Sequence, residues 1–193
     1  YYKRESQILY PPVDLVGQKC SSFKKNYYVC LSRLVKQKGI DVAVKTCSRY
    51  NLPLWVVGDG GEFNYLKKIS GKSINFLRQC GDRQKKQILA GAKALIYTSI
   101  DEDFGIVPVE ALALGVPVIA HNSGGVKETV VDGVNGVFFE DLSESSLKKA
   151  IDRFNRLKII KKKCIDSADK FSNVNFKKRF WALLNESEFL KKG

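Results

Sequence analysis

The sequence contains no methionine, a single histidine (His121) and five cysteines, none of which forms a Cys-x-x-Cys pair. Zinc sites and disulfide frameworks need closely spaced cysteine and histidine ligands, so this pattern argues against both. It favours reduced, mostly buried thiols in a cytosolic protein. We interpret the lone His121 as a structural or peripheral residue.

Three further signatures are missing. No run of eighteen apolar residues occurs, so no membrane-spanning helix is predicted. The start of the chain lacks the apolar segment of a signal peptide, and with the absent methionine it leads us to expect a fragment of a longer protein. The dinucleotide fingerprint Gly-x-Gly-x-x-Gly does not follow the first predicted strand, which argues against NAD or FAD.

Positive charge is in excess: 33 Lys and Arg residues stand against 20 Asp and Glu residues, a net charge of +13. This balance favours anionic partners such as phosphates, nucleic acid or an acidic membrane face. Aromatic residues do not alternate with the basic ones as a nucleic-acid stacking platform requires. We therefore interpret most basic segments as solvated helix faces and predict no nucleic-acid partner, with a basic nucleic-acid or membrane-surface binder as the alternative.

Short apolar segments alternate with amphipathic ones along the chain. The apolar segments predict six strands, at 27–31, 52–60, 73–78, 93–99, 116–120 and 136–140. Helices are predicted at 39–50, 63–69, 82–92, 107–114, from about 125, after Ser143 as N-cap, at 161–171 and at 176–189. This order predicts an α/β fold, a Rossmann-like parallel sheet of about six strands in three layers.

Ligands of such sheets lie beyond the carboxyl ends of the strands, so the segments after each strand are the candidate site. Arg33 and Lys38 bracket the segment after the first strand, where cations would meet an anion lying over the sheet. The glycine-rich turn Gly58–Gly61 follows the second strand and permits close backbone approach, although it needs no ligand to explain it.

The segment 99–115, SIDEDFGIVPVEALALG, carries Glu102 and Glu110 on either side of a predicted helix start. Pro108 suits a first helical turn and Gly115 suits its end, so the helix is expected at 107–114. The amides of Phe104, Gly105 and Ile106 would then form an unsatisfied helix terminus, a ready phosphate site. The two carboxylates would accept hydrogen bonds from hydroxyls at either side of the phosphates. A ligand of this shape is a nucleotide sugar.

Several segments resemble glycosyltransferase family 4, whose members are retaining enzymes with the GT-B fold. The stretch with Glu102 and Glu110 resembles the E-x7-E motif of that family. SRLVKQKGID resembles its phosphate-binding loop, WVVGDGGE its second-strand turn, and GVPVIAHNSGGVKETVVDGVNGVFF its tail. The resemblance covers about residues 10–180, with the segments in the expected order.

The resemblance implies a domain organisation. Residues 17–174 would form the nucleotide-sugar-binding domain of a two-domain enzyme, and residues 1–16 the linker to an N-terminal acceptor domain that is not in this chain. Residues 175–193 would contain the helix that crosses back to that domain.

Roles for individual residues follow from the resemblance. Arg33 and Lys38, with the amides of Phe104, Gly105 and Ile106, would bind the donor diphosphate. Glu102, the catalytic-site carboxylate, would hydrogen-bond the transferred sugar and position its anomeric carbon, and a role as covalent nucleophile stays open. Glu110 would take the ribose hydroxyls. The base would lie near the segment that follows the third strand: Phe76, Leu77, Arg78 and Gln79.

The resemblance also implies the chemistry: transfer of a sugar with retention, with no cofactor and no divalent metal, because protein cations and a helix terminus replace the metal. The wording of the motifs is most similar to mannosyltransferases that use GDP-mannose in lipid-linked or surface polysaccharide assembly. The expected location is the cytoplasm, with peripheral contact at the cytoplasmic membrane face. A UDP-sugar donor, or a nucleotide-binding module without turnover, are the alternatives.

Overall fold

The computed structural model describes residues 7–14, 26–78 and 80–186. Its centre is one sheet of six parallel strands in the order β3-β2-β1-β4-β5-β6. The strands are β1 (Tyr28–Leu31), β2 (Leu54–Val57), β3 (Ile74–Leu77), β4 (Ala94–Tyr97), β5 (Val118–His121) and β6 (Gly136–Phe139). The predicted α/β fold with a Rossmann-like parallel sheet is confirmed, and all six strands lie within the predicted segments or extend them by one residue.

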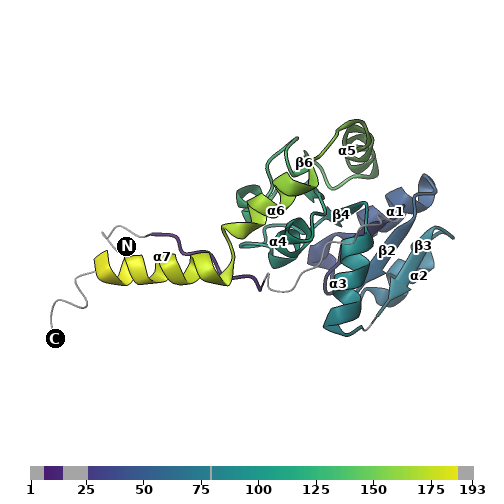
Figure 1. Cartoon of the computed structure of the whole chain (residues 1–193). Coiled ribbons are helices and arrows are strands. Elements are labelled where there is room, and N and C mark those ends of the chain that lie inside the picture. Colours follow the sequence, from purple (N-terminus) through teal and green to yellow (C-terminus); the bar gives the residue numbers. More distant parts are fainter. Residues whose placement is uncertain (1–6, 15–25, 79, 187–193) are drawn as a thin grey trace, which may run out of the picture.

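Helices cover both faces of the sheet (Figure 1). The helices are α1 (Ile40–Arg49), α2 (Phe63–Ile69), α3 (Asp82–Gly91), α4 (Ile106–Ala113), α5 (Glu144–Arg156), α6 (Lys161–Asp169) and α7 (Asn173–Glu186). Side chains of α1, α2 and α5 pack into the hydrophobic core on one face, and those of α3, α4 and α6 pack into the core on the other.

Alternation along the strands explains why two separate cores form. Tyr28 and Cys30 of β1 belong to the core under α1 and α5, whereas Val29 between them belongs to the core under α4. Leu95 and Ile96 of β4 divide in the same way. Because successive side chains of a strand point to opposite faces, a strand covered on both sides must be apolar throughout. This is why each predicted strand appeared as a continuous apolar run.

Some predicted boundaries were wrong. The helix expected from about Gly125 is a short 3-10 helix, η2 (Gly124–Glu128), and a second one, η1 (Lys36–Lys38), precedes α1. Helix α3 begins at Asp82 as predicted and ends at Gly91, one residue before its predicted end. The last helix begins earlier than residue 176, at Asn173, and α4 begins at Ile106, one residue before its predicted start.

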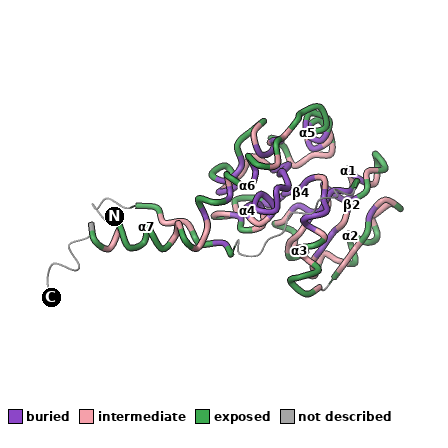
Figure 2. The backbone as a smooth tube through the Cα atoms, in the orientation of Figure 1, coloured by how far each residue is buried: buried purple, intermediate pink, exposed green. Residues whose placement is uncertain are grey.

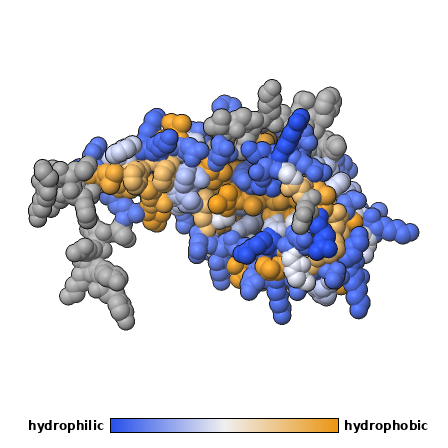
Figure 3. Space-filling model, turned by 90° about the horizontal axis from the view of Figure 1, so that it is seen from below, coloured by the Kyte–Doolittle hydropathy of each residue, from blue (hydrophilic) through white to orange (hydrophobic). Residues whose placement is uncertain are grey.

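The two ends of the described chain lie together, away from the sheet. Helix α7 projects from the body and the segment of residues 7–14 runs beside it (Figure 1). The amide of Val13 donates to the carbonyl of Phe171 at 2.9 Å, which ties this segment to the start of α7. Much of α7 is exposed (Figure 2), and apolar residues gather along it (Figure 3). Among the described helices, none is both long and apolar enough to cross a bilayer.

Candidate functional site

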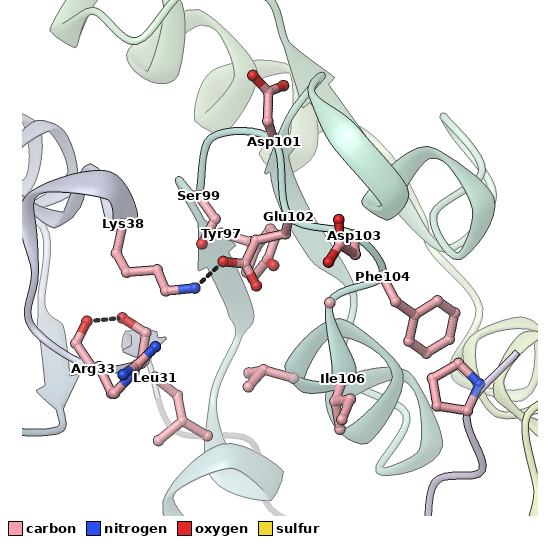
Figure 4. Close-up of a pocket in the computed structure, with 14 residues that line it drawn as sticks. Leu31, Arg33, Lys38, Tyr97, Ser99, Asp101, Glu102, Asp103, Phe104 and Ile106 are labelled. Atoms are coloured by element: carbon pink, nitrogen blue, oxygen red, sulfur yellow. Dashed lines mark hydrogen bonds and ion pairs between the residues drawn. The ribbon is translucent and has the colours of Figure 1, made fainter.

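A pocket of about 450 Å³ opens at the carboxyl ends of β1 and β4 (Figure 4). The chain leaves β1 for β2 on one side, but after β3 it crosses to β4 on the other side of β1. This is the point at which the strand order reverses, and in open parallel sheets the loops diverge there to leave a crevice for ligands. The predicted residues Arg33, Lys38, Glu102 and the 104–106 segment all line this pocket.

Arg33 occupies a junction. A second pocket, of about 440 Å³, lies over the ends of β1 and β2, and Arg33 lines both pockets. Its side chain is exposed, and no carboxylate of the described residues forms an ion pair with its guanidinium. The guanidinium is therefore free to meet an anion that lies between the two pockets.

Lys38 and Glu102 point toward each other across the first pocket and form an ion pair (Figure 4). Contacts with the end of β4 hold Lys38 in place: the Thr98 hydroxyl donates to the carbonyl of Lys38 at 2.6 Å. The next residue, Gly39, has a φ of 58°, and a Cβ there would lie 2.8 Å from the carbonyl oxygen of Thr98. Glycine is required at position 39 because the backbone is left-handed there and packs directly against the backbone of Thr98, the residue after β4.

Helix α4 begins at the pocket with unpaired donors. Gly105 is its N-cap with a φ of 82°, and neither a capping side chain nor an acidic residue lies in its first turn. No described residue accepts a hydrogen bond from the amides of Phe104, Gly105 or Ile106. Such a terminus carries a partial positive charge that favours an anion. A Cβ on Gly105 would lie 2.9 Å from the Tyr97 hydroxyl. Glycine at this position therefore avoids a clash with Tyr97 and adopts the positive φ without strain.

Tyr97 forms part of the wall under this terminus. It is buried at the end of β4, and burial raises its pKa to about 12. The hydroxyl therefore stays protonated at neutral pH and adds no negative charge beside the helix terminus.

Glu110 lies one turn further along α4 and is separate from Glu102. Its carboxylate is 3.9 Å from the ammonium of Lys85, a residue that lines the second pocket. Burial raises the pKa of Glu110, and Lys85 and Lys86 partly offset this effect. Glu102 lines the first pocket, whereas Glu110 lines neither pocket and lies beside the second one through its contact with Lys85.

The predicted base-binding segment is divided by the structure. Phe76 and Leu77 do not follow the third strand but lie within β3, and neither lines a described pocket. Arg78 lines the second pocket, where it pairs with Asp59 at 2.9 Å and stacks on Phe63 at 4.4 Å. Gln79 lies outside the described residues. Its role, like the others taken from the family resemblance, stays a prediction.

The glycine-rich turn after β2 has a purpose that needs no ligand. A Cβ on Gly58 would lie 1.9 Å from the carbonyl oxygen of Ser32, and one on Gly60 would lie 2.4 Å from that of Leu34. Both glycines have positive φ and press against the segment after β1 that carries Arg33. The close approach predicted from these glycines is therefore made by the protein's own backbone.

Sequence reasoning missed the residues that support Glu102. Ser123, Gly124 and Gly125 follow β5 and contact the backbone of residues 101–103. The signal was present in the Ser-Gly-Gly tripeptide directly after a predicted strand. Glycines after a strand by themselves indicate only a turn. Nothing in the tripeptide points to residues 101–103, which lie about 20 positions earlier in the chain.

His121 has the structural role expected of it. Its ring stacks at a tilt on Phe139, and its two nitrogens lie 3.4 Å and 3.2 Å from the carbonyl oxygens of Ser99 and Glu140. These contacts link β5 to the segments after β4 and β6. Among the described residues, no three His, Cys, Asp or Glu side chains cluster as metal ligands would.

The sequence and the structure both match known proteins. The family model for glycosyl transferases group 1 matches residues 18–171. The chain is 35% identical over 170 residues to the alpha-1,3/1,6-mannosyltransferase ALG2 of Mus musculus, covering 71% of this chain and 41% of that protein. It is 33% identical over 135 residues to a glycogen synthase of Thermus thermophilus, covering 66% of this chain and 31% of that enzyme. The chain spans less than half the length of these curated relatives.

Among solved structures, Anabaena HepE in complex with UDP and glucose superposes with a TM-score of 0.78 at 22% identity, covering 94% of this chain and 57% of that one. At this identity the match supports the fold only. The family match covers most of the chain, and residues of the matched region line the crevice where the strand order reverses. The chain therefore belongs to the glycosyl transferases group 1 family.

Proposed function

We propose that this chain is the donor-binding domain of a retaining glycosyltransferase that uses a nucleoside diphosphate sugar. The observation that carries the proposal is the position of Arg33 between two pockets, opposite the unpaired amides at the start of α4. A diphosphate has negative charge in the middle of the molecule and a different group on either side. It would place its phosphates at this junction and one group in each pocket.

The first pocket would take the transferred sugar. Glu102 would accept hydrogen bonds from sugar hydroxyls and position the anomeric carbon. Lys38 is paired with Glu102 in this structure. An ammonium carries three donors, so Lys38 would keep this contact and still donate to a phosphate oxygen once the donor is bound.

The second pocket would take the nucleoside. Glu110 would accept hydrogen bonds from the ribose hydroxyls, which would replace its contact with Lys85. The base would lie against the Arg78 side of the pocket. Burial raises the pKa of Glu110, and hydrogen bonds from two ribose hydroxyls would stabilise its ionised form.

The chemistry would depend on charge at the leaving group. As the bond between the anomeric carbon and the phosphate breaks, negative charge grows on the nucleoside diphosphate. Arg33, Lys38 and the α4 amides are already aimed at that charge, and such preorganised groups lower a barrier because they need no rearrangement. The acceptor hydroxyl would attack the anomeric carbon on the face that the phosphate leaves and give its proton to the leaving phosphate oxygen, so that the configuration is retained. No divalent metal would be required, because these groups supply the positive charge.

We propose GDP-mannose as the donor, because a mannosyltransferase is among the relatives with the highest identity. The acceptor would be held by an N-terminal domain outside this chain, and a lipid-linked acceptor would place the enzyme in the cytoplasm at the membrane face. A UDP-sugar donor is the second candidate, favoured by the structural neighbour whose complex holds UDP and glucose. A nucleotide-binding module without turnover is a third, since the chain spans less than half of its curated relatives.

Calorimetric titration tests the proposal. GDP, UDP, GDP-mannose and UDP-glucose are each added to the chain and to an Arg33→Ala variant. A hydrogen bond to a charged group contributes about 1.5–3 kcal/mol, so Arg33→Ala is expected to weaken nucleotide binding roughly tenfold or more. Arg156→Ala is the matched control, because Arg156 is an exposed arginine at the end of α5, outside both pockets.

Binding of GDP and GDP-mannose by the unmodified chain and the control, with loss in Arg33→Ala, supports the proposal. Stronger binding of the UDP pair would replace the proposed donor by the second candidate. If none of the four compounds binds at millimolar concentration, or if Arg33→Ala binds as well as the control, the proposed donor site is wrong.

A further inference from the structure

The segment that carries Glu102 has an unusual backbone. Asp101, the residue before Glu102, has a φ of 44°, in the left-handed region that few residues other than glycine adopt. Such a conformation is unfavourable for a residue with a Cβ and persists only where the surroundings hold it. The source of that restraint decides how firmly Glu102 is aimed into the pocket.

The restraint on Asp101 comes from the segment that follows β5. The Ser123 hydroxyl donates to the carboxylate of Asp101 and accepts from the Asp101 amide at 3.1 Å. The amide of Gly125 donates to the carbonyl of Glu102 at 2.7 Å. Ser123 lies directly after β5, and β5 pairs with β4, so the two segments leave the sheet side by side.

Close packing leaves no space for side chains in this contact. A Cβ on Gly124 would lie 2.5 Å from the carbonyl oxygen of Glu102, and one on Gly125 would lie 2.1 Å from that of Asp103. These distances are shorter than real Cβ contacts, so the two backbones touch directly. None of the residues 123–125 lines either described pocket. The segment therefore acts on the site through residues 101–103 and not by contact with a ligand.

We propose that Ser123–Gly124–Gly125 is a brace that orients Glu102 toward the transferred sugar, with Ser123 as a positioning residue. This inference rests on the proposed function, because it assigns the brace to the sugar end of the donor site. The nucleoside end is independent of it: Arg78, Lys85 and Glu110 make no contact with the brace.

The brace makes a specific prediction about affinity. Without the Ser123 hydroxyl, Asp101 loses two hydrogen bonds and its backbone is free to leave the left-handed region, which turns Glu102 away from the pocket. The added affinity that a sugar gives to a nucleotide should fall, while the affinity for the nucleotide alone should not. A role in stability alone would not separate these two affinities.

Three serine variants test this. Ser123→Ala removes the hydroxyl, and Ser123→Thr retains it in an extended conformation (φ −142°, ψ 139°) that β-branched residues favour. Ser143→Ala is the matched control: the Ser143 side chain caps α5 by accepting from the amide of Ser146, far from the pockets. Affinities for GDP and GDP-mannose, and for UDP and UDP-glucose, are measured by calorimetry, together with the melting temperature. Glu102→Gln is included as the reference for loss of the sugar contact.

We expect Ser123→Ala to weaken GDP-mannose binding about two- to tenfold, which corresponds to the loss of one hydrogen bond between Glu102 and the sugar. Binding of GDP alone should change by less than about twofold. Ser123→Thr should restore the difference. Ser143→Ala should lower the melting temperature and leave both affinities unchanged. If UDP-glucose is the preferred donor, the same split is expected within the UDP pair.

The failures are distinguishable. If the sugar adds no affinity in the unmodified chain, or Glu102→Gln changes nothing, then the assignment of Glu102 is wrong and the proposed function fails at that point. If Glu102→Gln weakens only the nucleotide sugar but Ser123→Ala leaves the difference intact, the function stands and the brace is overturned. If Ser123→Ala weakens GDP and GDP-mannose equally, Ser123 is only structural and the inference is again overturned.

Discussion

The two pockets of the site are held in different ways. Around the first pocket, hydrogen bonds from other segments hold the backbone of the charged residues: the Thr98 hydroxyl donates to the carbonyl of Lys38, and the Gly125 amide donates to the carbonyl of Glu102. The ion pair between Lys38 and Glu102 is added to these bonds. Around the second pocket, the charged residues hold one another through side chains, as in the pairs Arg78–Asp59 and Lys85–Glu110. Hydrogen bonds to the backbone cannot exchange without moving the loops, whereas a side-chain pair such as the exposed Arg78–Asp59 exchanges readily with solvent or ligand.

The difference is instructive because the two ends of a nucleotide sugar make different demands. Chemistry at a sugar needs its anomeric carbon in one position, and small displacements reduce rates steeply. A nucleoside needs only to be held. A rigid first pocket and an adaptable second pocket would meet both demands, and three substitutions test this comparison.

The largest effect is expected where the first pocket is most rigid. Gly125→Ala would place a Cβ 2.1 Å from the carbonyl oxygen of Asp103, and backbone cannot move aside as a flexible side chain does. We expect a loss of about 3 kcal/mol or more in the free energy of unfolding, measured by denaturant titration.

Gly61→Ala is the control for this substitution. A Cβ at Gly61 has nothing within 4 Å and its φ is not in the left-handed region, so stability should be nearly unchanged. If both variants are equally stable, the backbone contact between the two segments is not rigid and the comparison fails.

An intermediate effect is expected at Glu110, the carboxylate that contacts Lys85 beside the second pocket. Burial raises its pKa in the folded chain, so the ionised form is less favourable there than in the unfolded chain. That cost is present above the raised pKa and disappears as the pH falls through it toward the ordinary value of about 4.3. Glu110→Gln should therefore be more stable than the unmodified chain at pH 7, and this advantage should vanish at low pH.

The same variant should bind nucleotides less well. A neutral amide is a weaker acceptor for ribose hydroxyls than a carboxylate, and we expect GDP affinity to fall about five- to tenfold. Melting temperatures between pH 3 and pH 7 and calorimetry at pH 7 measure the two effects. A variant that is less stable at neutral pH would show that Lys85 and Lys86 outweigh the burial of Glu110.

The smallest effect is expected for the exposed pair at the rim of the second pocket. Asp59 accepts from Arg78 and from the amide of Gly60, and the Arg78 guanidinium lowers the pKa of its carboxyl. Both side chains are solvent-accessible, and such pairs contribute little to stability. Asp59→Asn should leave the melting temperature nearly unchanged at low and high salt. A clear drop that salt abolishes would mean that this pocket, too, is held rigidly.

Much of the fold was predictable because its signals are local. Runs of apolar residues mark strands covered on both faces, and Pro108 predicts the start of α4 within one residue. The short helix η2 was mispredicted, because the glycines at 124 and 125 serve a contact with another segment and not a helix. Phe76 and Leu77 fell within the strand predicted at 73–78, as they do in β3, and only the family resemblance assigned them to the base.

The candidate site divides in the same way. The residue types and their positions after strands could be read from the sequence: Arg33, Lys38 and Glu102 line one pocket as expected. The contacts between these residues could not be predicted from the sequence. The ion pair between Lys38 and Glu102 joins residues that are 64 positions apart, and nothing in either segment specifies the other.

The sequence by itself determined the α/β class, the parallel sheet and the segments that face the ligand, because alternating polarity and helix-end residues act over a few positions. Only the tertiary structure decided that Arg33 stands between two pockets, that Lys38 pairs with Glu102, and that residues 123–125 support Glu102. The physical reason is the strand order: β1 lies between β2 and β4, and β5 beside β4, so loops distant in sequence meet at one edge of the sheet.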